Sequence, residues 1–323
     1  MQSVPDSPVC NTTPRFGTYL GRCGDTNLKL RERGVSRFRQ YVSEKRWQWI
    51  SAFDDALAVG VAIVDAGFFG MAFCWVFDRA SSTLRFEDDV VLPPPLLSVT
   101  THPTVGTVAT VDVPRYRLRM ERTREQLLVS GTFGGADISL AFEPDDDTAI
   151  TAICPVSERD GGVNVTQKEP GVPVTGRVRL ADGSHHTPDG VGFLDYSHGL
   201  LGRTTRWDWA FASGETADGT PVAFNLVSHF NDGLENVVWL DGEPYPVGRA
   251  TIRQPERQDG HWHVSTDCGT VGATLTVEGA RSQHVDAGLV KSSYHQPLGR
   301  FRGTVGAHEF EGVGVAEEHL TKW

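Results

Sequence analysis

Hydrophobic and polar residues alternate along several short stretches of the chain, a pattern that predicts strands with one buried face. The alternation is strictest at residues 115–123 (RYRLRMERT) and 126–133 (QLLVSGTF). A short polar turn separates these two stretches, so we expect them to form a hairpin in a sheet with one solvent-exposed face. Residues 47–53 (WQWISAF) alternate in the same way and predict a further strand.

The longest apolar run, residues 57–77, would be long enough to cross a bilayer. Asp65 lies at its centre, glycines interrupt it, and β-branched and aromatic residues dominate it. Because a charged group is costly at mid-membrane, we expect two buried strands joined at residues 65–67 and no stable membrane insertion.

Glycine and proline punctuate the chain at short intervals, with 35 and 18 residues respectively, which favours short strands and turns over long helices. Asp-Gly pairs at 182–183, 218–219 and 241–242 are typical of hairpin turns. The sequence therefore predicts an all-β fold of two packed antiparallel barrels or sandwiches.

A shift in composition at residues 157–173 predicts the link between the two halves. We expect an irregular N-terminal segment with a short helix over residues 1–40, a first β domain over 41–165 and a second over 166–323.

Composition narrows the range of partners. The net charge of −11 argues against nucleic acid or an anionic membrane as the main partner. Five scattered cysteines without a CxxC motif argue against a disulfide framework or a zinc knuckle. Residues 1–17 lack the order of a signal peptide, so we expect a cytoplasmic protein. No glycine-rich phosphate loop precedes a helix, so we expect no nucleotide cofactor.

The histidines are the remaining candidates for metal ligands. His261 and His263 would share a strand face, and His185, His186 and His229 are the other options. No third ligand is spaced to match, so we expect no metal site.

Residues 191–242 combine large apolar side chains with many polar groups, a density that predicts a pocket wall. Two W-x-W pairs are the main feature, because residues i and i+2 of a strand share a face. The predicted substrate-binding residues are Trp47, Trp49, Arg206, Trp207, Trp209, Asn225, Ser228, Glu235, Asn236 and Trp239. Ordinary core filling for the tryptophans, and strand-end capping for the polar residues, are the alternatives.

The run Asp195, Tyr196, Ser197, His198 is the sharpest cluster of titratable groups. A carboxyl group held against aromatic rings acquires a raised pKa and can act as a general acid, and a histidine can relay protons near neutral pH. The predicted catalytic residues are Asp195, Tyr196, His198 and Asp65. The alternatives are a structural aspartate at a strand end, a hydrogen-bonded pocket histidine and, for Asp65, a turn cap.

A further polar group, Glu317-Glu318-His319, lies near the C-terminus. We expect it to form a polar rim or a contact between the two domains.

Five blocks in order resemble the bacterial family known as domain of unknown function 2804: KRWQWISAFDD, AIVDAGFFGMAFCWVFD, GFLDYSHGLLGRTTRWDWA, FNLVS with ENVVWLDG, and FRGTVG with EGVGVAEEHLTKW. The likeness covers about residues 40–323. That family is distantly similar to the carotenoid hydratase, AttH-like and lipocalin-like Diels-Alderase group. The resemblance implies two lipocalin-like (calycin-like) β-barrel domains with an apolar ligand pocket.

Three functions follow from these features. The first is a cofactor-independent enzyme, a lyase or an isomerase or cyclase, that hydrates, cyclises or isomerises an apolar unsaturated molecule of isoprenoid or polyketide type. The second is a carrier that binds a hydrophobic ligand such as a lipid without chemistry, which this kind of fold also allows. The third, a structural or regulatory interaction protein, would require an exposed apolar patch. The expected partner is a small hydrophobic molecule, bound to a monomer or a homodimer.

Overall fold

Strands make up nearly all of the regular structure in the computed structural model, which describes residues 1–157, 162–254, 260–288 and 290–323. One sheet contains β1 (Gln2–Ser3), β4 (Gly17–Leu20), β5 (Glu44–Phe53), β6 (Leu57–Asp65), β7 (Gly70–Asp78), β8 (Thr83–Leu92), β9 (Leu97–Val99), β10 (Gly106–Val113), β11 (Tyr116–Arg122), β12 (Leu127–Phe133), β13 (Ala136–Phe142), β14 (Ile150–Ser157), β15 (Gly162–Leu180), β16 (His185–His186) and β17 (Asp189–Leu200).

The second sheet contains β18 (Thr204–Thr216), β19 (Pro221–Ser228), β20 (Val237–Leu240), β21 (Glu243–Pro246), β22 (Ala250–Arg253), β23 (His261–Thr266), β24 (Val271–Ala287), β25 (Val290–Val305) and β26 (His308–Lys322). The remaining elements are β2 (Val9–Cys10), β3 (Thr13–Pro14), the helix α1 (Arg37–Ser43) and the 3-10 turn η1 (Asn231–Gly233).

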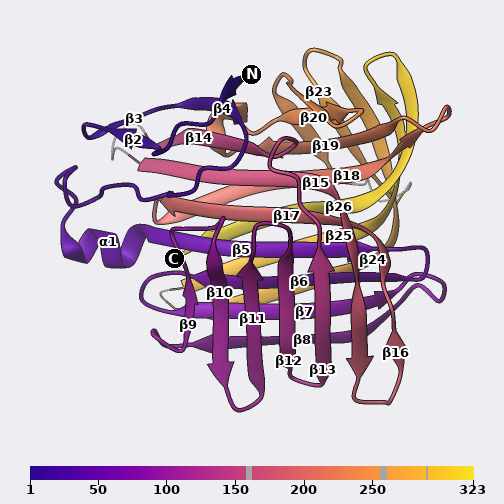
Figure 1. Cartoon of the computed structure of the whole chain (residues 1–323), viewed down its shortest axis with the longest axis horizontal. Coiled ribbons are helices and arrows are strands. Elements are labelled where there is room, and N and C mark those ends of the chain that lie inside the picture. The colour runs from indigo at the N-terminus through magenta and orange to yellow at the C-terminus, as the bar shows by residue number, and fades with distance from the viewer. Residues whose placement is uncertain (158–161, 255–259, 289) are drawn as a thin grey trace.

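The first sheet curls into a nearly closed barrel. Its main path runs β8-β7-β6-β5-β17-β15-β13-β12-β11-β10-β9. In Figure 1 the strands β10–β13 cross β6–β8 almost at a right angle, and apolar side chains from both groups form one core. The predicted hairpin is confirmed as β11 and β12, which pair antiparallel from Tyr116 opposite Phe133 to Arg122 opposite Leu127.

The apolar run from residue 57 forms the hairpin β6–β7, which confirms the two predicted buried strands. Val59 and Val61 face the barrel core, whereas Ala58 and Ala62 face the second sheet. Burial on both faces is the reason why this run does not alternate. Among the described residues, no helix combines the length and the apolar character needed to cross a membrane.

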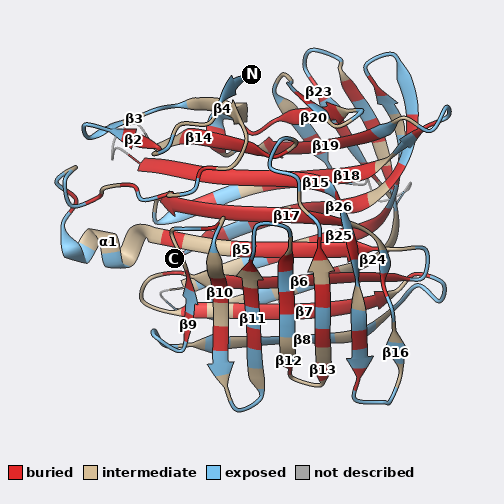
Figure 2. Cartoon of the chain, in the orientation of Figure 1, coloured by how far each residue is buried: buried red, intermediate tan, exposed pale blue. Residues whose placement is uncertain are grey.

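The second sheet runs β21-β20-β19-β18-β26-β25-β24-β23-β22 and curves into a half-barrel around its own apolar core. A third core lies between the two sheets. Phe193 of β17 stacks on Phe211 of β18 there, with ring centroids 4.1 Å apart. Figure 2 shows the consequence for the central strands, because β17 and the first half of β15 are buried almost continuously.

The chain passes from the first sheet to the second at residues 201–203, because β17 belongs to the first sheet and β18 to the second. The boundary expected at residue 165 lies within β15. Of residues 157–173, taken from composition as a link, 162–168 form the part of β15 that pairs with β14, and 158–161 lie outside the described residues.

The N-terminal segment contributes more order than its irregular sequence suggests. Strand β4 pairs with β14 and so extends the first sheet. The expected short helix is α1, which begins after the cap Ser36, whose side chain accepts a hydrogen bond from the Arg39 backbone amide. It ends at Ser43, three residues beyond the expected boundary at residue 40.

Candidate active site between the two sheets

A cavity lies where the two sheets meet, and strands of both sheets form its walls. The space open to the centres of water molecules is about 100 Å³, several times the roughly 10–15 Å³ that one water requires. Its apolar walls are Trp47, Trp49, Ala62, Val64, Met71, Phe73, Trp207, Trp209, Val227, Phe230 and Trp323. Its polar groups are Lys168, Asp195, Ser197, Asn231, Glu235, Arg281, Gln283, Ser292, Tyr294, Glu317 and His319.

Four tryptophans from the two W-x-W pairs line this cavity. Trp47 of β5 stacks on Trp207 of β18, with ring centroids 6.0 Å apart and planes 14° from parallel. Trp49 meets Trp209 edge to face at 5.2 Å. Each pair shares a strand face as predicted, and each indole also finds a partner on the other sheet. The aromatic wall therefore belongs to both sheets.

Lys168 on β15 is the centre of a buried cluster of charges. Its ammonium nitrogen lies 2.6 Å from Asp195 Oδ1 and 3.4 Å from Glu235 Oε2, and 5.2 Å from the Trp209 ring centroid. Burial lowers the pKa of Lys168, but the two carboxylates together outweigh it, so that the pKa is raised. The cluster thus holds one firm positive charge against two acidic groups.

Neighbouring side chains hold the two acidic groups of this cluster in position. Trp47 donates its indole N–H to Asp195 Oδ2 at 3.3 Å, and Asn231 donates to Glu235 Oε1. Asn225 accepts the Trp209 N–H at 2.8 Å and donates to the Glu235 backbone oxygen at 2.8 Å. Asn225 therefore acts on the cavity through its neighbours, because it does not line the cavity itself.

Glu317 of β26 is a second buried acidic group in the wall. Its carboxyl group accepts hydrogen bonds from Trp207 Nε1 at 2.7 Å and from Gln296 Nε2 at 2.8 Å. Burial is the main cause that raises the pKa of Glu317 to about 7, against the opposing effect of its hydrogen-bond donors. At neutral pH this carboxyl group can therefore both donate and accept a proton.

His319 lies two residues further along the same strand face. Its ring packs edge to face against the Trp207 ring, with ring centroids 4.3 Å apart, and its Nε2 lies 3.0 Å from Ser292 Oγ. Burial, and secondarily the positive charge of Arg281, lowers the pKa of His319 to about 3. The imidazole is therefore neutral at physiological pH. Glu317 and His319 were expected at a rim or a domain contact, and the structure places them in the cavity wall between the sheets.

The predicted run Asp195 to His198 divides between the two faces of β17. Asp195 lines the cavity, whereas Tyr196 and His198 point to the opposite face and do not. Tyr196 donates to the Thr100 backbone oxygen at 2.7 Å, and His198 Nε2 lies 2.8 Å from Glu44 Oε1. The structure therefore does not bring these two residues into the cavity with Asp195, because successive residues of a strand alternate.

Asp65 and Arg206 also lie outside the cavity wall. Asp65 accepts a hydrogen bond from the Gly67 backbone amide at 2.9 Å and pairs with Arg46 at 2.7 Å. The contact with Gly67 is the one expected if Asp65 caps a turn, the alternative to a catalytic role. Arg206 is half-exposed and lies 3.8 Å from both Asp208 and Glu318. An exposed arginine with such partners is typical of a solvated surface.

Three further predicted residues make structural contacts instead of lining the cavity. Ser228 donates to Asp208 at 3.4 Å. Asn236 accepts from the Val227 amide at 2.7 Å and donates to the Gly248 oxygen at 3.1 Å. Trp239 donates to the Thr148 backbone oxygen at 2.6 Å and packs in a separate apolar cluster. These contacts match the capping and core alternatives.

The sequence did not draw attention to Lys168 or Arg281. Lys168 stands in a polar run of β15 that also contains Asn164 and Thr166, and only the structure shows that this run is buried. Within residues 1–157, 162–254, 260–288 and 290–323, no group of three or more His, Cys, Asp or Glu side chains is arranged to hold a metal ion.

Comparison with known proteins agrees with this architecture. The sequence profile of the family named domain of unknown function 2804 matches residues 12–323. No curated protein matches the chain.

Two solved structures are similar along most of the chain. An AttH-like protein from Nitrosomonas europaea has a TM-score of 0.54 and 15% identity, covering 87% of this chain and 93% of its own. Kievitone hydratase from Nectria haematococca has a TM-score of 0.54 and 11% identity, covering 86% and 89%. These likenesses confirm the predicted all-β fold of two lipocalin-like units.

Proposed function

We propose that this chain, which belongs to the family named domain of unknown function 2804, is an enzyme acting on a small, largely apolar, unsaturated molecule. The substrate would be of isoprenoid or polyketide type, and the reaction a hydration, cyclisation or isomerisation in the tryptophan-lined cavity. One observation carries the proposal: a carboxyl group with a pKa of about 7, Glu317, lies in the wall of an aromatic cavity.

In this proposal Glu317 is the general acid. It transfers its proton to one carbon of a carbon–carbon double bond, whose π electrons form the new C–H bond. The other carbon becomes cationic, and the faces of Trp207 and its neighbours stabilise that charge. A general acid whose pKa lies near the working pH contributes roughly 10²–10⁴-fold in rate.

The cation is then consumed in one of three ways. Water adds to it and gives up a proton, or a neighbouring carbon loses a proton, or a second double bond attacks it and leaves a new cation, which then loses a proton from an adjacent carbon. In each case the Glu317 carboxylate takes the released proton, so the enzyme returns to its starting state. Hydration adds one water to the substrate, whereas the other two reactions leave its mass unchanged.

Asp195, the acid predicted from the sequence, has a different role in this proposal. Its carboxyl group is engaged with Lys168 at 2.6 Å, so we assign it to electrostatic stabilisation together with Glu235. The cluster sets two acidic groups against one ammonium group beside the aromatic wall. A preorganised negative charge favours a cationic transition state.

The fold similarity to kievitone hydratase supports including hydration among the reactions, although at 11% identity the likeness concerns the fold. The cavity itself equally suits an apolar ligand that is bound and released unchanged, which is the carrier alternative.

The test is turnover of a panel of isoprenoid and polyketide olefins in deuterated water, followed by mass spectrometry. We expect either a product that has gained one water or an isomer of the substrate that carries solvent deuterium on carbon. Glu317→Gln should lower the rate roughly a hundredfold or more. The matched control is Glu318→Gln, because the neighbouring side chain is part-exposed and lies outside the cavity wall. Recovery of every ligand unchanged would favour the carrier, and full activity of Glu317→Gln would exclude this acid.

A further inference from the structure

Arg281 lies in the cavity wall on the side of the second sheet, at the position of β24 opposite Gln296 of β25. Only 1% of its surface is exposed. Its guanidinium carbon lies 4.1 Å from the ring centroid of Phe73 and 5.1 Å from that of Tyr294. The cation thus lies against two aromatic rings, one from each sheet.

The hydrogen-bonding capacity of this guanidinium group is largely unused. Its Nε lies 3.0 Å from Glu87 Oε1, on a side chain that is itself partly exposed. Neither Nη1 nor Nη2 has a hydrogen-bond partner among the residues that the structure describes. Buried polar groups in folded proteins are nearly always paired, and a buried unpaired charge is strongly unfavourable. An arginine cannot relieve this by losing its proton.

The other cation of the cavity wall is in the opposite situation. Lys168 has two carboxyl partners within 3.4 Å. A ligand anion would therefore gain little at Lys168, where it would meet Asp195 and Glu235, and much at Arg281. The two free terminal nitrogens of a guanidinium group match the two oxygens of a carboxylate.

We propose that Arg281 binds a carboxylate on the ligand, so that the substrate class is a largely apolar, unsaturated carboxylic acid. The identification of the ligand as a substrate rests on the proposed function, but the binding itself does not. The hydrocarbon part would lie against the tryptophans while the carboxylate completes the hydrogen bonds of Nη1 and Nη2. In this proposal Arg281 binds the polar end of the ligand, whereas Arg206, predicted from the sequence to bind substrate, lies outside the cavity wall.

The test compares unsaturated acids with their methyl esters, which have the same hydrocarbon but no charge. Isothermal titration calorimetry with geranic acid and methyl geranate forms the first pair, and cinnamic acid with methyl cinnamate the second. We expect at least one acid to bind at least tenfold more tightly than its ester at pH 7.5. Arg281→Met should abolish that preference while leaving ester binding within twofold.

Two variants serve as controls. Arg281→Lys keeps the charge but not the two-pronged geometry, so it should retain part of the preference for the acid. Arg206→Met removes a half-exposed arginine outside the cavity and should change neither affinity. Thermal melting of each variant shows whether it is folded before binding is measured.

Equal binding of acid and ester in both pairs, or an undiminished acid preference in Arg281→Met, overturns the proposal. If Arg281→Met does not fold, an Arg281→Lys variant with the full wild-type preference overturns it. If acids bind more tightly than their esters but no ligand is turned over, the proposed enzymatic function is wrong and carboxylate binding by Arg281 stands. If neutral olefins are turned over but acids bind no more tightly than their esters, carboxylate binding by Arg281 is wrong and the proposed enzymatic function stands.

Discussion

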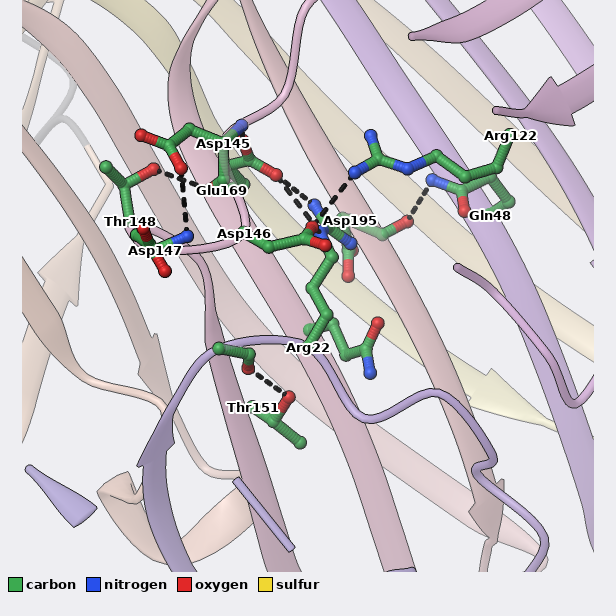
Figure 3. Close-up of polar contacts among 12 residues, drawn as sticks. Arg22, Gln48, Arg122, Asp145, Asp146, Asp147, Thr148, Thr151, Glu169 and Asp195 are labelled. Atoms are coloured by element: carbon green, nitrogen blue, oxygen red, sulfur yellow. Dashed lines mark hydrogen bonds and ion pairs between the residues drawn. The ribbon is translucent and has the colours of Figure 1, made fainter. Parts of the chain in front are cut away.

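Two buried arginines in this protein differ sharply in how their charge is satisfied. Arg22 is held by the first sheet: its Nε lies 3.1 Å from Glu169 Oε2 and 3.4 Å from Asp146 Oδ1, and its Nη2 also contacts Glu169. Figure 3 shows this network, in which Arg122 approaches the same Asp146 at 2.9 Å. Arg281, whose side chain is even more deeply buried, has only the part-exposed Glu87 at its Nε.

The difference separates a structural ion network from a binding site. In the Arg22 network, positive and negative groups come from the protein itself and tie the N-terminal segment to β15. At Arg281 the protein supplies the cation but leaves two terminal nitrogens unpaired toward a cavity. A site that binds a ligand anion needs this incompleteness, and it is expected to lower the stability of the empty protein.

The largest effect is expected at the complete network. Arg22→Met would leave the buried carboxylate of Glu169 without its closest partner, with Arg122 only partly compensating. Breaking a buried pair from one side typically destabilises by about 3–5 kcal/mol. Urea denaturation should show a loss of that size, whereas Arg179→Met, in an exposed pair with Asp137, should cost at most about 1 kcal/mol. Similar small losses for both would mean that the Arg22 network is not structural.

Glu317 differs from both buried arginines, because a buried carboxyl group can avoid its charge by staying protonated, whereas an arginine cannot lose its charge. Its pKa rises from 4.5 to about 7. Between these values the folded state binds more protons than the unfolded state, so this group lowers stability as pH rises from 4.5 to 7. The loss amounts to about 3 kcal/mol.

The measurement is the free energy of unfolding across that pH range in the wild type and in Glu317→Gln. The difference between the two is needed because His319, with its pKa lowered to about 3, stabilises the protein with the opposite slope as pH rises toward 6.5. The stability of wild type relative to the variant should fall by about 3 kcal/mol and then level off above pH 7. Parallel curves would show that Glu317 titrates normally.

Much of the fold could be predicted from the sequence because its signals are local. Alternation marked the β11–β12 hairpin, and the interrupted apolar run marked β6 and β7. The same period of two placed Trp207 and Trp209 on one face, where both meet the cavity. Applied consistently, it would also have placed Arg206 on the other face, which is where the structure has it.

The site was less predictable because it depends on pairing between distant strands. Strand β17 is buried on both faces, so the sequence cannot tell whether Asp195 or Tyr196 meets the cavity. Lys168 and Glu235 are far apart in the chain, and Arg281 approaches Phe73 only because β24 packs over the first sheet. No short window of sequence contains these relations.

The smallest and most discriminating effect concerns Arg281 in the absence of ligand. Arg281→Met removes a buried charge with two unpaired nitrogens and keeps an unbranched, apolar side chain against Phe73 and Tyr294. Lost cation–π contacts offset part of the gain, so we expect stability to rise by about 1 kcal/mol or to stay unchanged. Denaturation of ligand-free protein measures this change. A loss of more than about 2 kcal/mol would place Arg281 in the same class as Arg22, a structural cation whose pairing with Glu87 is sufficient. A gain in stability together with a loss of acid binding would mean that this residue is retained for the ligand at the expense of the empty fold.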